Sequence, residues 1–162
     1  MSPGCRGNRF DWVTAHLHFK RVLDVTSERK AAMPIQWNDS YSTGIGEIDN
    51  QHKQLFVFIN KLGEASQQSV SKDLLEKTLG FLETYVKAHF AFEEACMSQR
   101  KCPVAEKNRD AHQKFLEAFH GFKNRFIRDG ANSALLQEIH SVSEKWITSH
   151  ICKIDVMLKR PG

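Results

Sequence analysis

Residues 71–98, SKDLLEKTLGFLETYVKAHFAFEEACMS, decide the fold. Their apolar residues recur at steps of three and four, which is the period of a helix with one buried face. His89 and Glu93 lie one turn apart on that face, so an imidazole and a carboxylate point to the same side. Ser71 stands where a hydroxyl can cap the first turn. The stretch therefore predicts a long amphipathic helix with metal-binding or acid-base groups on its buried side.

The same apolar period occurs in the rest of the folded part. It predicts helices over about 47–66, from Pro103 to Asp129, and over about 133–158. Proline is favoured in the first turn of a helix, and Asp129-Gly130 marks a helix end. Because each apolar stripe needs a partner and the connections are short, the pattern favours an all-α protein, an antiparallel up-down four-helix bundle.

Chain length and charge divide the sequence into two parts. At 162 residues with 41% apolar content, the chain is sized for one domain with a single core. Residues 1–32 hold six basic and three acidic groups, so most of the net charge of +4 lies there. We expect residues 1–32 to be an N-terminal extension, either an upstream leader or the product of a start codon placed too early. Residues 33–162 are expected to form the folded domain, which lacks the basic stripe of a nucleic-acid-binding protein.

The sequence also limits where the protein works. No apolar run approaches the roughly 18 residues that a membrane span requires. Charged residues interrupt the opening segment, so it has no signal-peptide core. The four cysteines lack the density and spacing of a disulfide-rich secreted domain. We therefore expect a cytoplasmic protein with neither a membrane nor a nucleic acid as its partner.

Ionisable residues recur on the predicted inner faces of all four helices. They are His52, His89, Glu93, His112, His150 and Asp155. A single buried histidine is usually a core residue with a hydrogen bond, but burying the whole set would cost several kcal/mol for each group unless a metal compensates them. His150 and Asp155 diverge by about 140° on one continuous helix, so they would reach a shared site from different levels. Imidazoles and carboxylates together suit iron, zinc, copper or manganese.

These residues belong to a wider set of motifs with a characteristic order. The motifs are Trp37 with Tyr41-Ser42-Thr43-Gly44-Ile45, Ile48-Asp49-Asn50-Gln51-His52, His89-Phe90 with Glu93-Glu94 and Met97, Pro103 with His112 and Phe115, and Trp146 with His150-Ile151 and Asp155. In their order and spacing, over about residues 34–158, they closely resemble those of the bacterial hemerythrins.

The resemblance implies a non-haem centre of two iron ions with an oxo or hydroxo bridge, at which dioxygen or small anions bind. It assigns Glu93 and Asp155 as bridging carboxylates, His52 and His89 to one iron, and His112 and His150 to the other. It also implies an apolar pocket for dioxygen, lined by Leu55, Phe90, Trp146, Ile147 and Ile151.

One position departs from the family pattern. The family has a further ligand histidine four residues before the one that matches His112, and this chain has Asn108 there. Six of the seven usual ligands therefore remain. An amide oxygen is a poorer donor than an imidazole, so we expect Asn108 to bind weakly, to hold a water or to leave a coordination position open. The resulting hypothesis is fast oxidation by air, which suits redox sensing better than oxygen storage.

Three functions follow from the resemblance. The first is an oxygen or redox sensor module, itself not an enzyme, that regulates a C-terminal signalling output such as a diguanylate cyclase. The sequence 159–162, KRPG, is typical of the start of a linker to such a domain. The second is a stand-alone oxygen carrier or iron-binding protein. The third, ranked lowest, is a di-iron oxidase or peroxidase.

Overall fold

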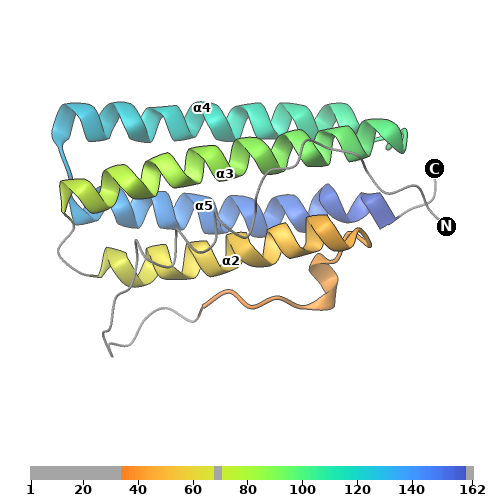
Figure 1. Ribbon diagram of the computed structural model, residues 1–162, viewed down its shortest axis with the longest axis horizontal. Helices are drawn as coiled ribbons and strands as arrows, with labels where there is room; N and C mark the ends of the chain where they lie inside the picture. Colours follow the sequence, from red (N-terminus) through yellow and green to blue (C-terminus); the bar gives the residue numbers. More distant parts are fainter. Residues whose placement is uncertain (1–33, 68–70, 160–162) are drawn as a thin grey trace.

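The described part of the chain forms a bundle of four long helices. The computed structural model describes residues 34–67 and 71–159. Its helices are α2 (Gly46–Ser66), α3 (Lys72–Gln99), α4 (Ala105–Asp129) and α5 (Ser133–Lys153), with short 3-10 helices η1 (Asp39–Tyr41) and η2 (Asp155–Lys159) at the two ends. Successive long helices run in opposite directions, α2 packs mainly against α5, and α3 packs against α4 (Figure 1). The prediction of an antiparallel all-α bundle is confirmed, whereas the predicted extension, residues 1–32, lies outside the described residues.

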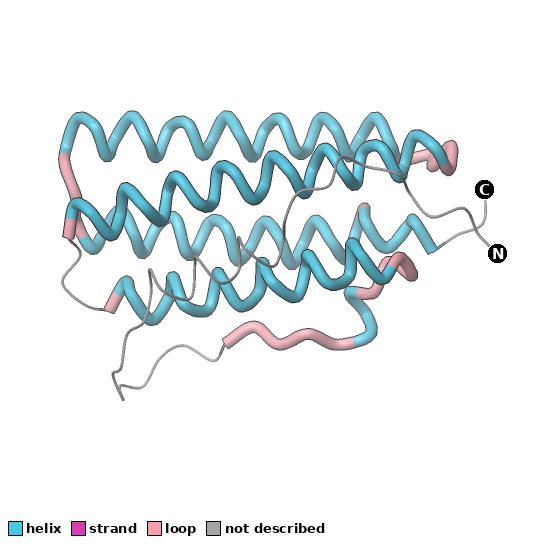
Figure 2. Tube along the Cα trace, in the orientation of Figure 1, coloured by secondary structure: helices cyan, strands magenta, loops and turns pink. Residues whose placement is uncertain are grey.

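Local side-chain chemistry fixes several helix ends. The Ser71 hydroxyl accepts a hydrogen bond from the Leu74 amide at 3.1 Å, and this confirms the predicted cap of α3. The Asn132 side chain caps α5 in the same way, by accepting from the Leu135 amide at 2.7 Å. At the end of α4, Gly130 has φ 75°, a backbone conformation that favours glycine. Short loops connect α3 to α4 and α4 to α5 (Figure 2).

Two predicted boundaries are wrong. Helix α4 begins at Ala105 and not at Pro103, because the chain first closes a turn in which the Ala105 amide donates to the Cys102 carbonyl at 3.1 Å. Helix α5 ends at Lys153 rather than near residue 158. Its cap, Ile154, has φ −122° and ψ −59°, and the chain continues as the separate 3-10 helix η2. This break determines the position of Asp155 in the candidate site.

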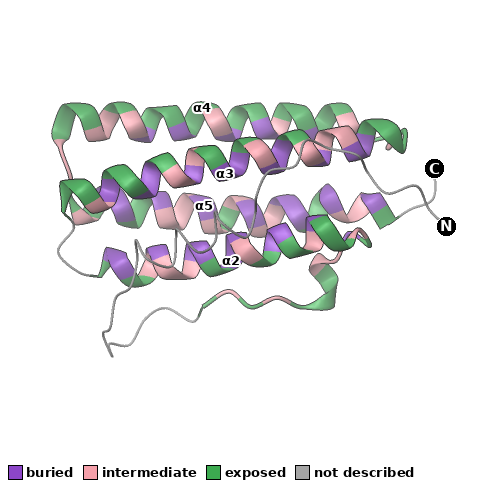
Figure 3. Cartoon of the chain, in the orientation of Figure 1, coloured by how far each residue is buried: buried purple, intermediate pink, exposed green. Residues whose placement is uncertain are grey.

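The inner faces of the helices form the core, and the outer faces are exposed (Figure 3). Leucine, isoleucine and phenylalanine side chains fill most of that interior. Polar groups are buried within it at one end of the bundle, among them His52 and Glu93, each 0% exposed. Within the described residues, no helix is long and apolar enough to cross a membrane.

The chain enters α2 through a set of hydrogen bonds to one carboxylate. Asp49 accepts from the Thr43 amide at 2.6 Å, from the Thr43 hydroxyl at 2.7 Å and from the Ser42 hydroxyl at 2.8 Å. These bonds hold the segment before α2 against the first turn of that helix. They fix the first turn of α2, in which Asp49 lies about one turn before His52.

Candidate metal centre

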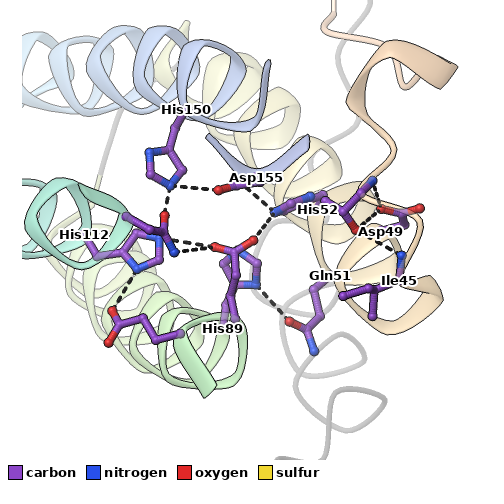
Figure 4. Close-up of polar contacts among 12 residues, drawn as sticks. Ile45, Asp49, Gln51, His52, His89, His112, His150 and Asp155 are labelled. Atoms are coloured by element: carbon purple, nitrogen blue, oxygen red, sulfur yellow. Dashed lines mark hydrogen bonds and ion pairs between the residues drawn. The ribbon is translucent and has the colours of Figure 1, made fainter. Parts of the chain in front are cut away.

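The structure brings the six predicted ligand residues together inside the bundle (Figure 4). They come from five elements, and every one of them is at most 6% exposed. The contributors are His52 of α2, His89 and Glu93 of α3, His112 of α4, His150 of α5 and Asp155 of η2. Residues up to 103 positions apart in sequence, such as His52 and Asp155, thus line one small volume.

The ligand atoms form two groups that share Glu93. In each group the atoms lie within 4.8 Å of one another. One group is His52, His89 and Glu93, and the other is Glu93, His112, His150 and Asp155. The Glu93 Oε1 atom lies 3.8 Å from His52 Nε2, and its Oε2 atom lies 3.3 Å from His112 Nε2. One carboxylate therefore presents a different oxygen to each group.

Asp155 has the same relation to the two groups. Its Oδ2 atom lies 3.5 Å from His52 Nε2, and its Oδ1 atom lies 3.1 Å from His150 Nε2. On a continuous helix Asp155 would diverge from His150 by about 140°. The break at Ile154 removes that divergence, because η2 begins with Asp155 and turns its carboxylate back toward the interior.

Burial keeps three of the imidazoles neutral. Desolvation lowers the pKa of His52 to about 3, that of His150 to about 4, and that of His89 well below its usual value. Neighbouring imidazoles lower these pKa values further. A neutral imidazole has a free lone pair, and this is the form that binds metal ions.

Two groups of the centre have raised pKa values. Desolvation raises the pKa of the Asp155 carboxyl to about 7. For His112, burial opposes the charged form, but hydrogen bonds to Glu93 and Glu94 outweigh it and raise the pKa. A bound cation would lower both pKa values, because carboxylates and imidazoles bind metal ions in their deprotonated forms.

Several buried polar atoms of the centre lack a hydrogen-bond partner within residues 34–67 and 71–159. They are both ring nitrogens of His52, Glu93 Oε1, Asn108 Oδ1 and both carboxylate oxygens of Asp155. An unpaired buried polar group costs about 1–3 kcal/mol, so an interior with this many of them is costly unless something binds there. Metal ions would satisfy these atoms, and the nitrogen and oxygen donors match the preferences of iron. The residues present therefore fit a pair of metal ions.

Two side chains outside this set orient the imidazoles. The Nδ1 atom of His89 donates to Gln51 Oε1 at 2.8 Å, and the Nδ1 atom of His112 donates to Glu94 Oε1 at 2.9 Å. Both contacts leave the Nε2 atom directed at the centre, which is how hydrogen-bonded partners position metal-binding histidines. Gln51 could not be assigned this role from the sequence, since its only signal is its place directly before His52.

Asn108 also faces the centre. It lies one turn before His112 on α4 and is 0% exposed. Its Nδ2 atom lies 3.4 Å from Glu93 Oε2, while Oδ1 is one of the unpaired atoms. The amide thus occupies the position that the family resemblance assigns to a further ligand, and binding through its oxygen stays a prediction.

The residues predicted to line a dioxygen pocket lie in one apolar cluster beside the centre. The cluster includes Leu55, Phe90, Ile147 and Ile151, with Trp146 packed against it. Phe90 stacks on the His112 ring at a centroid distance of 3.7 Å, and Trp146 stacks on His150 at 4.3 Å. Apolar rings therefore cover two of the imidazoles, and the role in dioxygen binding stays a prediction.

Known proteins share this sequence pattern. Residues 43–160 match the hemerythrin HHE cation binding domain. A bacteriohemerythrin of Pseudomonas aeruginosa (strain UCBPP-PA14) is 30% identical over 115 residues, which cover 71% of this chain and 72% of the relative. A hemerythrin-like protein of Naegleria gruberi is 28% identical over 127 residues, 78% of this chain and 92% of the relative. With a domain match over most of its length and relatives of this similarity, the chain belongs to the hemerythrin family.

Proposed function

We propose that this hemerythrin domain holds two iron ions, one at each histidine group. The observation that supports this most directly is the position of Glu93 and Asp155, which each present one oxygen to either group. His52 and His89 would hold one ion, and His112 and His150 the other. A bound di-iron pair supplies reversible oxidation and the binding of dioxygen or small anions.

We further propose that the domain acts as an oxygen or redox sensor in the cytoplasm. The support comes from Asn108, which offers an amide where the family pattern has an imidazole. Asn108 leaves the metal position beside His112 and His150 more open than a third imidazole would. An amide also binds a metal ion less strongly than an imidazole does. We therefore expect fast oxidation in air. A protein that oxidises readily is better suited to report on oxygen than to store it.

The helix break gives the sensor a route to an output. Asp155 is the one predicted ligand that lies outside the four long helices, and it begins η2. The same short helix carries Leu158, whose carbonyl accepts from Arg100 at 3.1 Å. A change in how Asp155 is held would move η2 relative to the end of α3. We propose that a signalling partner or fused domain, such as a diguanylate cyclase, reads this movement.

Anaerobic loading tests the proposal. The protein is loaded with ferrous iron, its metal is counted, and visible absorption is followed after air is admitted. We expect two irons per chain, one for each group of predicted ligands, and a rapid, direct change to a diferric spectrum. A spectrum that persists in air and reverses when oxygen is removed would identify a carrier instead. Failure to bind iron would contradict the di-iron centre itself.

A further inference from the structure

A pocket opens on the outer side of His150, between α4 and α5. Its volume is about 440 Å³, which is within the range of small-molecule sites. Lys107 comes from α4, and the other lining residues come from α5 and the residue that follows it. The lining comprises Lys107, Val142, Lys145, Trp146, Ser149, His150, Lys153 and Ile154.

The rim of this pocket is positively charged. Lys145 and Lys153 lie on the same side of α5, with Ser149 midway between them, and Lys107 faces them from α4. None of these three ammonium groups has a hydrogen bond or ion pair to another described residue, and no acidic side chain is among the described residues that line the pocket. Their charge is therefore available to a ligand.

Other lysines of the bundle are in a different situation. Their ammonium groups are 2.6–2.8 Å from carboxylates: Lys77 from Asp73, and Lys87 and Lys123 from Glu83. The three lysines of the pocket differ from Lys77, Lys87 and Lys123 in lacking a counter-charge among the described residues. Convergence of three such groups on one cavity favours an anion.

The floor of the pocket is apolar and aromatic. Val142 and Ile154 line it together with the Trp146 indole, which stacks on the His150 ring with an interplanar angle of 13°. An aromatic floor favours a flat ring, since ring pairs gain attraction beyond the area they bury. We propose that the pocket binds a small aromatic anion, a flat ring that carries a phosphate or carboxylate group, with its charge among the three lysines and its ring against Trp146. This pocket opens on the outer side of α5, whereas the proposed dioxygen pocket lies inside the bundle; the two share Trp146 and His150.

Calorimetric titration with phenyl phosphate tests this inference on the whole protein. A variant in which Lys107, Lys145 and Lys153 are each replaced by Gln is compared with a matched variant in which Lys77, Lys87 and Lys123 are replaced in the same way. Both lose three positive charges, and circular dichroism checks that both remain helical. We expect about tenfold weaker binding for the pocket variant and little change for the control, because each exposed charge contact contributes modestly. Binding to the unchanged protein should also weaken with added salt.

Three further ligands separate the parts of the proposal. Benzyl alcohol keeps a ring without charge, inorganic phosphate keeps the charge without a ring, and phenylacetate replaces phosphate by carboxylate. We expect both aromatic anions to bind more tightly than benzyl alcohol and inorganic phosphate, and their ratio tells which charged group is preferred. Equal affinity of the two lysine variants for phenyl phosphate would overturn the site, including the case in which the anion binds at a metal ion. Inorganic phosphate that binds as tightly as phenyl phosphate would overturn the role of the ring. The titrations do not use a metal signal, so their failure leaves the di-iron proposal standing.

Discussion

Glu93 occupies the point where the two histidine groups meet. Its Oε1 atom is directed to His52 and its Oε2 atom to His112, and the residue is 0% exposed. No neighbouring carboxylate can replace it, because Glu94 is turned outward to the far side of His112. Removal of this one side chain therefore tests whether the two groups act as one centre.

We expect Glu93→Ala to abolish a stable two-metal centre. The matched control is His120→Ala, since the His120 side chain is 55% exposed on α4 and lies outside both groups. Iron content after anaerobic loading and desalting should fall to at most one ion per chain in the first variant and stay unchanged in the second. Equal iron content in the two variants would show that the ligand assignment is wrong.

Asn108→His should restore the ligand that the family pattern contains. Asn108 is buried next to Glu93, and an imidazole there would join His112 and His150 around one ion. We expect oxidation by air to slow by about tenfold or more. The reason is that an imidazole is a stronger donor than the amide and would fill the coordination position that Asn108 leaves open. Stopped-flow absorption after mixing with air-saturated buffer measures the rate. An unchanged rate would refute the open-position argument and leave the family assignment intact.

At the residue level, the sequence predicts the metal-ligand residues but not the side chains that hydrogen-bond to them and orient them. Helical spacing places His89 and Glu93 on one face, and the structure agrees. The contact between Gln51 and His89 joins residues 38 positions apart and depends on how two helices are rotated against each other. Periodicity within one helix contains no information about that rotation.

The end of α5 shows the same limit at the level of secondary structure. The apolar period continues through Ile154 and Leu158, so the sequence predicts an unbroken helix. In the structure both residues are buried, Ile154 at the break and Leu158 after it, and a hydrogen bond from the Arg100 side chain to the Leu158 carbonyl holds the new direction. Tertiary contacts of this kind override the local helical preference.

Two helical glycines differ in how closely other side chains approach them: Gly63 lies where α2 packs against α5, and Gly80 lies on an open part of α3. A Cβ atom on Gly63 would lie 2.7 Å from His140 Nε2, whereas one on Gly80 would meet nothing within 4 Å. Gly80→Ala should raise the free energy of unfolding by about 0.5–1 kcal/mol, because alanine favours helix. Gly63→Ala should raise the free energy of unfolding by about 1 kcal/mol less than Gly80→Ala does, because the His140 imidazole must move to make room for the new Cβ atom. Urea unfolding measures both.

A third variant identifies the cause of that difference. In a His140→Ala background the close contact is absent, so the two glycine substitutions should become similar in effect. If Gly63→Ala stabilises the unmodified protein as much as Gly80→Ala does, the close approach of α2 and α5 at Gly63 is wrong.

On the scale of the whole molecule, the bundle combines a stable apolar core with a costly polar interior. The apolar cluster extends along all four helices, while the ionisable groups gather at one end. The core can stabilise the fold without metal, but the unpaired atoms of His52 and Asp155 reduce that stability. Any ion that binds only the folded chain stabilises it, so chelation should lower the urea midpoint.

The metal-free protein should also lose stability on acidification. His52, His89 and His150 have lowered pKa values, about 3 for His52 and about 4 for His150, against 6.5 in the unfolded chain. Below pH 6.5 the unfolded chain therefore binds protons at these residues that the folded chain does not, and stability falls as the pH falls. The raised pKa values of Asp155, about 7, and His112 act in the opposite sense, but three groups outweigh two.

Between about pH 6.5 and pH 5 we expect the free energy of unfolding of chelator-treated protein to fall by on the order of 1 kcal/mol per pH unit, measured by urea titration. A His52→Leu variant should show a shallower slope, because one of the three groups is gone. A stability that rises on acidification would mean that these imidazoles are protonated inside the fold, and the neutral, metal-ready interior would then be wrong.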